Sequence, residues 1–377
     1  MGKIRVLVVD DAVVMRRLIS DVLSEDPDIE VVGVAANGRI ALQKLTQVNP
    51  DVVTMDMEMP EMDGIATVRE LRRDFPRLPV IMFSTLTSRG AAQTLDALSA
   101  GATDYVTKPA NVGCITEGIS RLRQDLIPKI KSHVAPPSFA PAAPVGTIRK
   151  STAPVASVCR SGEAVGRIDV VAVGTSTGGP NALADVFSAI DPVLPVPVVI
   201  VQHMPPLFTA MLAERLDKIG RLRFHEGAEG MRLEKGHAYL APGGKHMFVR
   251  RDGTQVVLGL NEEPPENSCR PAVDVLFRSV AQVYGAASLG VILTGMGQDG
   301  LRGCENLTEA GARIIAQDRA TSVVWGMPGF VAQAGLAERV VPLEEVAGEI
   351  NRRVKISADR YQRPALSRAV TTVGATN

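Results

Sequence analysis

The chain has few cysteines, no surplus of either charge and no long apolar run. Its 377 residues include 4 cysteines, which show neither the CxxC spacing of a zinc site nor the density of a disulfide framework. Lysine plus arginine and aspartate plus glutamate number 41 each, so no basic excess indicates a nucleic-acid partner. The longest apolar stretch, 196–201, is far shorter than the ~20 residues that span a bilayer, which argues against membrane insertion. Asp10 and Asp11 interrupt the N-terminus before a signal-peptide core is complete, so we expect a cytoplasmic protein.

What is present is a regular alternation of apolar runs and helical patterns at the start of the chain. Strands are expected at about 4–10, 30–35, 52–56, 80–84 and 105–107. Helical patterns such as 14–23 and 65–74 separate these strands. Five units of this kind predict a flavodoxin-like (βα)5 domain over residues 1–125.

Polar side chains stand at the ends of four of these expected strands. Asp10 and Asp11 follow the first strand and Asp56 the third, while Ser84 and Lys108 follow the fourth and fifth. The carboxyl ends of parallel strands share one edge of the sheet, where open α/β sheets bind ligands. Three carboxylates at one point favour Mg²⁺, a hard cation that prefers oxygen ligands. The positive charge of Lys108 and the hydroxyl of Ser84 then suit the site to a phosphoryl group.

The composition changes after this first domain. Residues 126–165 are rich in proline, alanine and serine and have no helical or strand period, which predicts a semi-extended linker. A second domain is expected over 166–355, and a disordered tail over 356–377 because that segment is polar and lacks a period. The two domains are therefore predicted to be tethered, so that the first can dock on the second or leave it.

The second domain opens with an apolar run at 168–173 and a glycine-rich turn that contains Ser176. The sequence Gly174-Thr-Ser-Thr-Gly matches the nucleophile elbow G-x-S-x-G, in which a serine lies at the end of a strand. A serine in such a turn can equally hold a phosphate through backbone N–H groups. From this loop alone, a nucleophile and an anion-binding loop are about equally supported.

Two later strand ends favour the nucleophile. His203 follows the apolar run 196–201, and Asp299 follows the run 288–293. A serine hydroxyl needs a base that takes its proton, and an aspartate can orient that base and offset its charge. The order serine, histidine, aspartate differs from the serine, aspartate, histidine order of α/β-hydrolases. The other histidines of the second domain lie in a region, 224–260, whose alternation predicts β-hairpins, and we interpret them as structural or peripheral: His225, His237 and His246.

The first domain resembles the receiver domains of two-component response regulators. The resemblance rests on Asp10-Asp11, Asp56 followed by Met59-Pro60 and Asp63-Gly64, Ser84, and Lys108-Pro109. It implies that Asp56 accepts phosphate as an acyl phosphate. It also implies that Asp11, Asp56 and the Glu58 carbonyl hold Mg²⁺, and that Ser84 and Tyr105 report phosphorylation.

Over about residues 1 to 350 the chain resembles the chemotaxis response regulator protein-glutamate methylesterases, the CheB family. The most specific motifs are Gly174-Thr-Ser-Thr-Gly-Gly-Pro, Gln202-His-Met-Pro, Ala241-Pro-Gly-Gly-Lys-His-Met, Arg270-Pro-Ala-Val-Asp-Val-Leu-Phe and Leu293-Thr-Gly-Met-Gly-Gln-Asp-Gly. The resemblance implies a doubly wound α/β catalytic domain with a mostly parallel sheet. It makes Ser176 the nucleophile, His203 the general base and then acid, and Asp299 the orienting carboxylate. The Met296 backbone N–H would bind the oxyanion, no cofactor would be needed for the ester reaction, and Cys269 replaces a histidine that the family often has.

The same resemblance implies a function in sensory adaptation. The enzyme would remove methyl esters from glutamates of methyl-accepting chemoreceptors, release methanol and deamidate specific glutamines. A chemotaxis histidine kinase would donate the phosphate. We expect the unphosphorylated receiver to cover the surface that holds Ser176, and phosphate on Asp56 to weaken that packing. Two alternatives stay open: the same chemistry in a non-flagellar sensory pathway, and a catalytically weak response regulator that docks on receptors.

Overall fold

The apolar runs of the N-terminal domain form a five-stranded parallel sheet in the order β2-β1-β3-β4-β5. The strands are β1 (Ile4–Val9), β2 (Ile29–Ala35), β3 (Val52–Asp56), β4 (Val80–Ser84) and β5 (Asp104–Thr107). The helices are α1 (Val13–Ser24), α2 (Gly38–Val48), α3 (Gly64–Asp74), α4 (Ser88–Ser99) and α5 (Ile115–Val134). This strand order confirms the flavodoxin-like prediction and places the ligand edge between β1 and β3.

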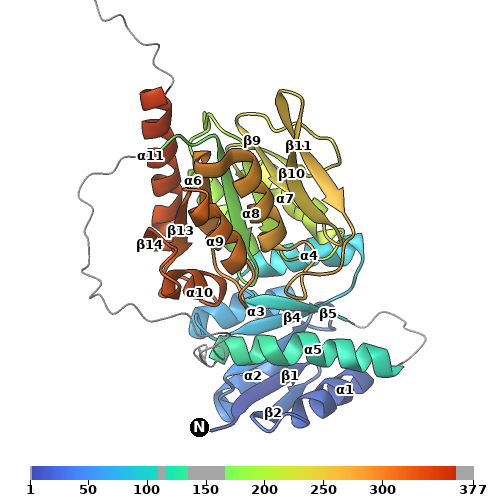
Figure 1. Ribbon diagram of the computed structural model, residues 1–377. Helices are drawn as coiled ribbons and strands as arrows, with labels where there is room; N and C mark the ends of the chain where they lie inside the picture. The colour runs from blue at the N-terminus through green and yellow to red at the C-terminus, as the bar shows by residue number, and fades with distance from the viewer. Residues whose placement is uncertain (1, 109–114, 135–165, 362–377) are drawn as a thin grey trace, which may run out of the picture.

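The computed structural model describes residues 2–108, 115–134 and 166–361. In Figure 1 the N-terminal domain, coloured blue to blue-green, packs directly against the C-terminal domain, coloured green to red. Within these described ranges no helix is long and apolar enough to cross a membrane.

Helix α5 corrects the predicted start of the linker. The linker is expected from residue 126, but α5 continues to Val134. Leu126 and Ile130 lie one turn apart on this helix, and both are fully buried in the core of the N-terminal domain. Their burial outweighs Pro128, whose cost in a helix interior is about 3 kcal/mol. The remainder of the expected linker, 135–165, lies outside the described residues.

The C-terminal domain is built on a seven-stranded parallel sheet in the order β14-β13-β12-β6-β7-β9-β8. Its strands are β6 (Val170–Thr175), β7 (Val198–Gln202), β8 (Arg223–Glu226), β9 (His237–Leu240), β12 (Ser288–Ile292), β13 (Arg313–Gln317) and β14 (Arg339–Val341). Its helices are α6 (Gly179–Ala189), α7 (Phe208–Ile219), α8 (Val273–Tyr284), α9 (Leu301–Glu309), α10 (Met327–Gln333) and α11 (Leu343–Tyr361). The central strand β6 lies between β12 and β7, so the strand order reverses there and the three carboxyl ends meet at one point.

The region expected to form β-hairpins contains one hairpin and two parallel strands. Strands β10 (His246–Asp252) and β11 (Gln255–Asn261) pair antiparallel in a small sheet of their own. The hairpin prediction is wrong for β8 and β9, which extend the main parallel sheet. Strand β9 lies between β7 and β8 with Ala238 to Leu240 at most 1% exposed, so it fills an interior sheet position that a surface hairpin cannot occupy.

Helix α11 corrects the predicted start of the tail. Residues 356–361 are helical, because one face of α11 packs on the core through Ile350 and Val354. The Ser357 hydroxyl is buried and accepts a hydrogen bond from the Ile168 N–H at 2.7 Å. This contact joins residues far apart in the chain, so the local polarity of the segment gives no sign of it. Residues 362–377 lie outside the described part of the chain.

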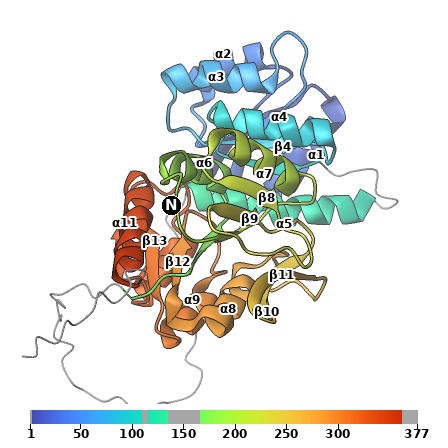
Figure 2. The same cartoon turned by 90° about the horizontal axis from the view of Figure 1, so that it is seen from above.

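The N-terminal domain covers the strand-end face of the C-terminal domain. Figures 1 and 2 both show α4 beside α6 and α7. Asn181 on α6 donates a hydrogen bond to a backbone carbonyl at the end of α4 at 2.8 Å. Tyr105 on β5 stacks on Phe208 at the start of α7, with ring centroids 5.1 Å apart. Arg215 on α7 pairs with Asp96 on α4 at 3.3 Å, so helices and a strand both contribute to this interface.

Candidate active site

Ser176 lies in the tight turn between β6 and α6. Its N–H donates to the Thr294 carbonyl at 3.0 Å, and its own carbonyl accepts from the Gly179 N–H at 2.8 Å. Gly178 has φ of 78°, a left-handed conformation that favours glycine. A Cβ on Gly295 would lie 2.8 Å from the Ser176 Cβ, so only glycine lets the loop after β12 approach this closely. These contacts fix the serine against the neighbouring strand end.

His203 and Asp299 form a hydrogen-bonded pair beside this turn. The His203 Nε2 atom lies 2.7 Å from Asp299 Oδ2. The carboxylate also accepts backbone N–H groups from the start of α8, from Val273 at 2.6 Å and Asp274 at 3.1 Å. Asp299 is 2% exposed and the histidine side chain 13%. The aspartate is therefore held at a helix N-terminus, where a negative charge is favourable, and it fixes the imidazole ring.

This pair favours a charged imidazole. Burial alone lowers the pKa of His203, but its contacts with Asp299 and Cys269 raise that pKa to about 10. Burial raises the pKa of Asp299, while the bond to His203 and the N–H groups of α8 lower it below its ordinary value. Because Nε2 faces the carboxylate, Nε2 carries the proton of a neutral ring, and Nδ1 is the nitrogen that can act as a base.

Three of the four predicted catalytic residues line one cavity of about 610 Å³, and the fourth, Asp299, is bound to His203. Ser176, His203 and Met296 lie on its C-terminal-domain side, and Tyr105 and Lys129 lie on the side of the N-terminal domain. In the described part of the chain, the contacts recorded for the His203 ring nitrogens are with Asp299 and Cys269, and the Ser176 hydroxyl is not among them. The cavity thus brings Ser176 and His203 together, although their side chains are not hydrogen-bonded to each other.

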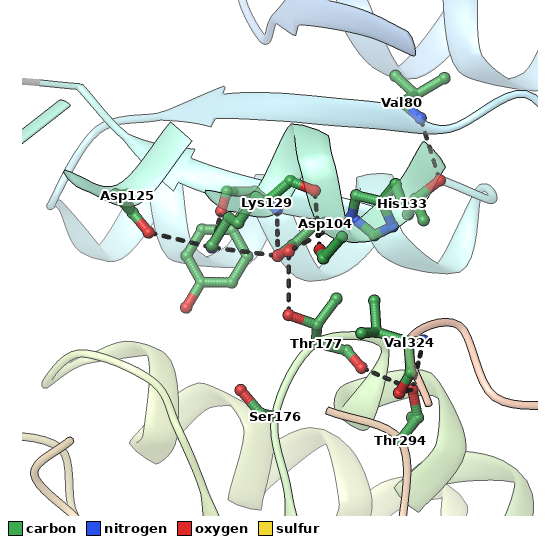
Figure 3. A network of polar contacts seen from close by, with 12 residues as sticks. Val80, Asp104, Asp125, Lys129, His133, Ser176, Thr177, Thr294 and Val324 are labelled. Atoms are coloured by element: carbon green, nitrogen blue, oxygen red, sulfur yellow. Dashed lines mark hydrogen bonds and ion pairs between the residues drawn. The ribbon is translucent and has the colours of Figure 1, made fainter. Parts of the chain in front are cut away.

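Thr177, the residue after the candidate nucleophile, contacts the N-terminal domain directly (Figure 3). Its hydroxyl donates to Asp104 Oδ2 at 3.2 Å. Asp104 is buried at the start of β5, with Lys129 Nζ 3.3 Å and His133 Nε2 3.7 Å from its carboxylate. Burial raises the pKa of Asp104, but Lys129 and His133 lower it to about 2. A charged carboxylate of one domain therefore binds the residue next to Ser176 in the other.

The predicted carboxylates of the N-terminal domain gather at the ends of β1 and β3. One oxygen from each of Asp10, Asp11 and Asp56 lies within 4.8 Å of the others. Lys108 Nζ lies 2.7 Å from Asp56 and 3.4 Å from Asp10. Burial raises the pKa of Asp56, and Lys108 offsets part of this rise. Asp10 Oδ2 has no hydrogen-bond partner in the described ranges, and one lysine does not balance three carboxylates, so the donor set fits a hard divalent cation.

Two further predicted residues lie near this cluster. The Glu58 carboxylate pairs with Arg89 at 3.1 Å, so its side chain is engaged elsewhere and the backbone carbonyl remains the expected metal ligand. Ser84 is buried at the end of β4, where its hydroxyl accepts a hydrogen bond from Thr94 at 2.6 Å. Thr94 belongs to α4, the helix that faces the C-terminal domain, so Ser84 connects the cluster to the interface.

Known proteins match both halves of this arrangement. Residues 6–120 match the response regulator receiver domain, and residues 171–350 match the CheB methylesterase family. A protein-glutamate methylesterase/protein-glutamine glutaminase of Nocardioides sp. (strain ATCC BAA-499 / JS614) is 52% identical over 366 residues, which cover 97% of this chain and 98% of the relative. One of Trichodesmium erythraeum (strain IMS101) is 48% identical over 364 residues, which cover 94% of this chain and 100% of the relative. The chain belongs to the protein-glutamate methylesterase/protein-glutamine glutaminase family.

Solved structures match each domain of this methylesterase family member separately. The catalytic domain of Thermotoga maritima CheB methylesterase is 37% identical, with a TM-score of 0.48, and covers 49% of this chain and 98% of its own. The response regulator domain of Thermotoga maritima CheB is 42% identical, with a TM-score of 0.31, and covers 34% of this chain and 94% of its own. Because residues 6–120 match the receiver family and residues 171–350 the CheB methylesterase family, the chain is a response regulator with a receiver domain and a methylesterase domain, as the sequence predicts.

The loop before α8 of the methylesterase domain contributes site residues that sequence reasoning missed. Asn267 donates to Asp299 Oδ1 at 2.9 Å and to Asp274 Oδ2 at 2.8 Å, so it links the two carboxylates. Cys269 Sγ lies 3.6 Å from His203 Nδ1. The loop has no helical or strand period, and the sequence marks Cys269 only as a departure from the family. Nothing in the local sequence shows that both side chains reach the catalytic pair.

The other histidines of the C-terminal domain have structural contacts, in keeping with their interpretation from the sequence. His246 is buried, with Nδ1 accepting from the Ala272 N–H at 3.2 Å and Nε2 3.1 Å from the Pro264 carbonyl. His225 and His237 stack and lie 2.9 Å apart through their ring nitrogens. None of the three is among the residues that line the cavity of Ser176.

Proposed function

We propose that this chain is a phosphorylation-activated hydrolase that demethylates glutamate methyl esters on chemoreceptors and deamidates specific receptor glutamines. The observation that carries the proposal is the 2.7 Å bond between Asp299 and His203, together with the cavity that His203 and Ser176 both line. A chemotaxis histidine kinase is the proposed phosphodonor. Service in a non-flagellar sensory pathway and a cytoplasmic location stay predictions from the sequence.

Four residues have a role in the proposed reaction. The Ser176 hydroxyl attacks the ester carbonyl while His203 Nδ1 takes its proton. Asp299 stabilises the imidazolium that forms, and the Met296 N–H binds the oxyanion. Methanol leaves with the proton from His203, and water then cleaves the acyl-enzyme to restore glutamate. Attack on a glutamine side chain follows the same course and releases ammonia.

The receiver supplies the proposed control of this reaction. Asp11, Asp56 and the Glu58 carbonyl would hold Mg²⁺, which offsets negative charge when a phosphoryl group reaches Asp56. Lys108, Asp10 and Ser84 lie around the same point and would respond to the new charge. A shift of Ser84 would move Thr94 and with it α4. A shift of β5 would move Asp104 and Tyr105, which contact the C-terminal domain.

Two successive residues of β5 support this route. Asp104 binds Thr177, and Tyr105 stacks on Phe208. The first contact lies on the turn that carries Ser176, and Tyr105 lines the same cavity as Ser176, so the receiver in this position limits the approach of a receptor helix. Phosphorylation of Asp56 would weaken the two contacts and shift the population toward an open form.

The test is methanol release from a methylated chemoreceptor. Ser176→Ala should lower the rate by about 10⁶ if Ser176 is the nucleophile of a working triad. Ser188→Ala, the same substitution on the exposed side of α6, is the matched control and should keep its rate. A Ser176→Ala chain that releases methanol as fast as this control would refute the proposed chemistry, and inactivity of both wild type and control would favour the docking alternative.

A further inference from the structure

The catalytic histidine has a thiol as its second partner. Cys269 Sγ lies 3.6 Å from His203 Nδ1, within reach of an S–H···N hydrogen bond. The opposite nitrogen, Nε2, is bound to Asp299. Thiol, imidazole and carboxylate thus stand in the order that activates cysteine nucleophiles in other enzymes. The proposed esterase reaction uses the histidine and the aspartate but gives Cys269 no role.

Cys304 provides the contrast within the same domain. It is fully buried, and burial raises the pKa of its thiol well above the ordinary value. Cys269 is only half-buried and lines the cavity of about 610 Å³ that holds Ser176. A neighbouring imidazole that takes up the thiol proton favours the thiolate, which is the reactive form of cysteine. Of these two thiols, only Cys269 combines access from the cavity with an adjacent base.

We propose that Cys269 is a covalent modification site, at which peroxides and other small electrophiles switch off the esterase. With hydrogen peroxide, the thiolate attacks one oxygen and the O–O bond breaks. The sulfur is oxidised by two electrons to a sulfenic acid, and the peroxide is reduced. The departing hydroxide takes the proton of the His203 imidazolium and leaves as water, so charge and atoms balance.

The effect on the esterase follows from which nitrogen the sulfur contacts. This part rests on the proposed function, in which Nδ1 of His203 takes the proton of Ser176. A sulfenic acid on Cys269 places a hydroxyl donor against Nδ1 and adds an oxygen to the cavity. Both changes keep the base from the serine. A small thiol reverses the modification in two steps. It first forms a mixed disulfide with Cys269 as water is lost, and a second thiol then reduces this disulfide.

The first experiment measures the thiol itself, independently of esterase activity. Full-length chain is alkylated with iodoacetamide, and mass spectrometry of the peptides gives separate rates for Cys269 and Cys304. At pH 7, Cys269 should react at least about tenfold faster than Cys304. In His203→Asn the Cys269 rate at pH 7 should fall about tenfold, because asparagine cannot take up the thiol proton.

The charges that face this thiol and imidazole come from both domains. Asp299 faces Nε2 of the ring, while Asp125, Lys129 and Arg270 line the same cavity. These groups are retained in His203→Asn, so a change in the alkylation rate of Cys269 reports the imidazole. Equal Cys269 rates in wild type and His203→Asn would overturn the thiol–imidazole pair.

The second experiment measures the switch. Wild type, Cys269→Ser and Cys304→Ala are treated with hydrogen peroxide, and each methanol-release rate is compared with that of the same untreated chain. The methanol-release rates of wild type and Cys304→Ala should fall at least about tenfold and recover with dithiothreitol. The rate of Cys269→Ser should stay at its own starting value. Thermal unfolding of each variant shows whether it is folded.

The two experiments separate failure of this proposal from failure of the proposed function. Active wild type whose Cys269 becomes oxidised without loss of methanol release would overturn the switch and leave the esterase reaction standing. A chain without any methanol release would end the proposed function, while the alkylation rates would still decide whether Cys269 is an activated thiol.

Discussion

The receiver site and the esterase site occupy the same place in their folds but differ in how their charges are balanced. In the receiver, Asp10, Asp11 and Asp56 cluster around one point, where Lys108 pairs with Asp56 and Asp10, and an Asp10 oxygen lacks a hydrogen-bond partner in the described ranges. In the esterase domain, both oxygens of Asp299 accept backbone N–H groups, and one also binds His203. In the proposed function a cation and a phosphoryl group complete the receiver site, so that it can change state. The carboxylate of the esterase site is already satisfied, which suits control by access.

The largest effect is expected when Asp299, the carboxylate whose hydrogen bonds are satisfied, loses its negative charge. Asp299→Asn should lower methanol release by about 10⁴, because the imidazolium loses its counter-charge and the ring its preferred tautomer. Asp252→Asn, on the exposed end of the β10–β11 hairpin, is the matched control and should keep the wild-type rate. A loss of less than about tenfold in Asp299→Asn would mean that His203 acts without its carboxylate.

The raised pKa of His203 predicts the direction of the pH dependence. The imidazole must be neutral to take the proton of Ser176, so kcat/KM should rise with pH, about tenfold per unit below the His203 pKa. Cys269 is one cause of the rise in that pKa, so Cys269→Ala should move the whole profile to lower pH. A pH–rate profile of both chains checks this shift, and a profile that falls with rising pH across the neutral range would contradict the role of His203 as a base.

A single substitution in the interface between the two domains should change the methanol-release rate least. Arg215→Ala removes the ion pair with Asp96, and exposed pairs of this kind contribute about 0.2–1 kcal/mol. Loss of that energy from the closed form should raise the basal rate by a factor of about 1.4 to 5. Arg17→Ala removes the exposed pair with Asp21 on α1, away from the interface, and should leave the basal rate unchanged.

Much of both sites could be predicted because their side chains lie at the ends of strands. Ser176, His203 and Asp299 each follow an apolar run, and parallel strands bring such positions to one edge whatever the rest of the chain does. The same reasoning applies to Asp10 and Asp56. What it requires is only the order of strands and helices, which the apolar periodicity gives.

The remainder depends on contacts between distant segments. Cys269 and Asn267 reach His203 and Asp299 through a loop without periodicity, so their place follows from the fold and not from their neighbours in sequence. The contact of Thr177 with Asp104 lies between two domains, and no local pattern encodes it. Helices α5 and α11 continue past their expected ends because buried faces around Leu126 and Val354 outweigh the polar and proline-rich composition nearby.

The most direct test of the account compares methanol release by full-length wild type and Asp56→Ala, each with and without Mg²⁺ and a small-molecule phosphodonor. A closed form favoured by about 1.4 kcal/mol predicts an increase of about tenfold in wild type on phosphorylation and none in Asp56→Ala. Mass spectrometry of the intact chain measures how much of the wild type carries phosphate. Equal rates with and without phosphate on Asp56 would contradict the claim that the receiver controls access to Ser176.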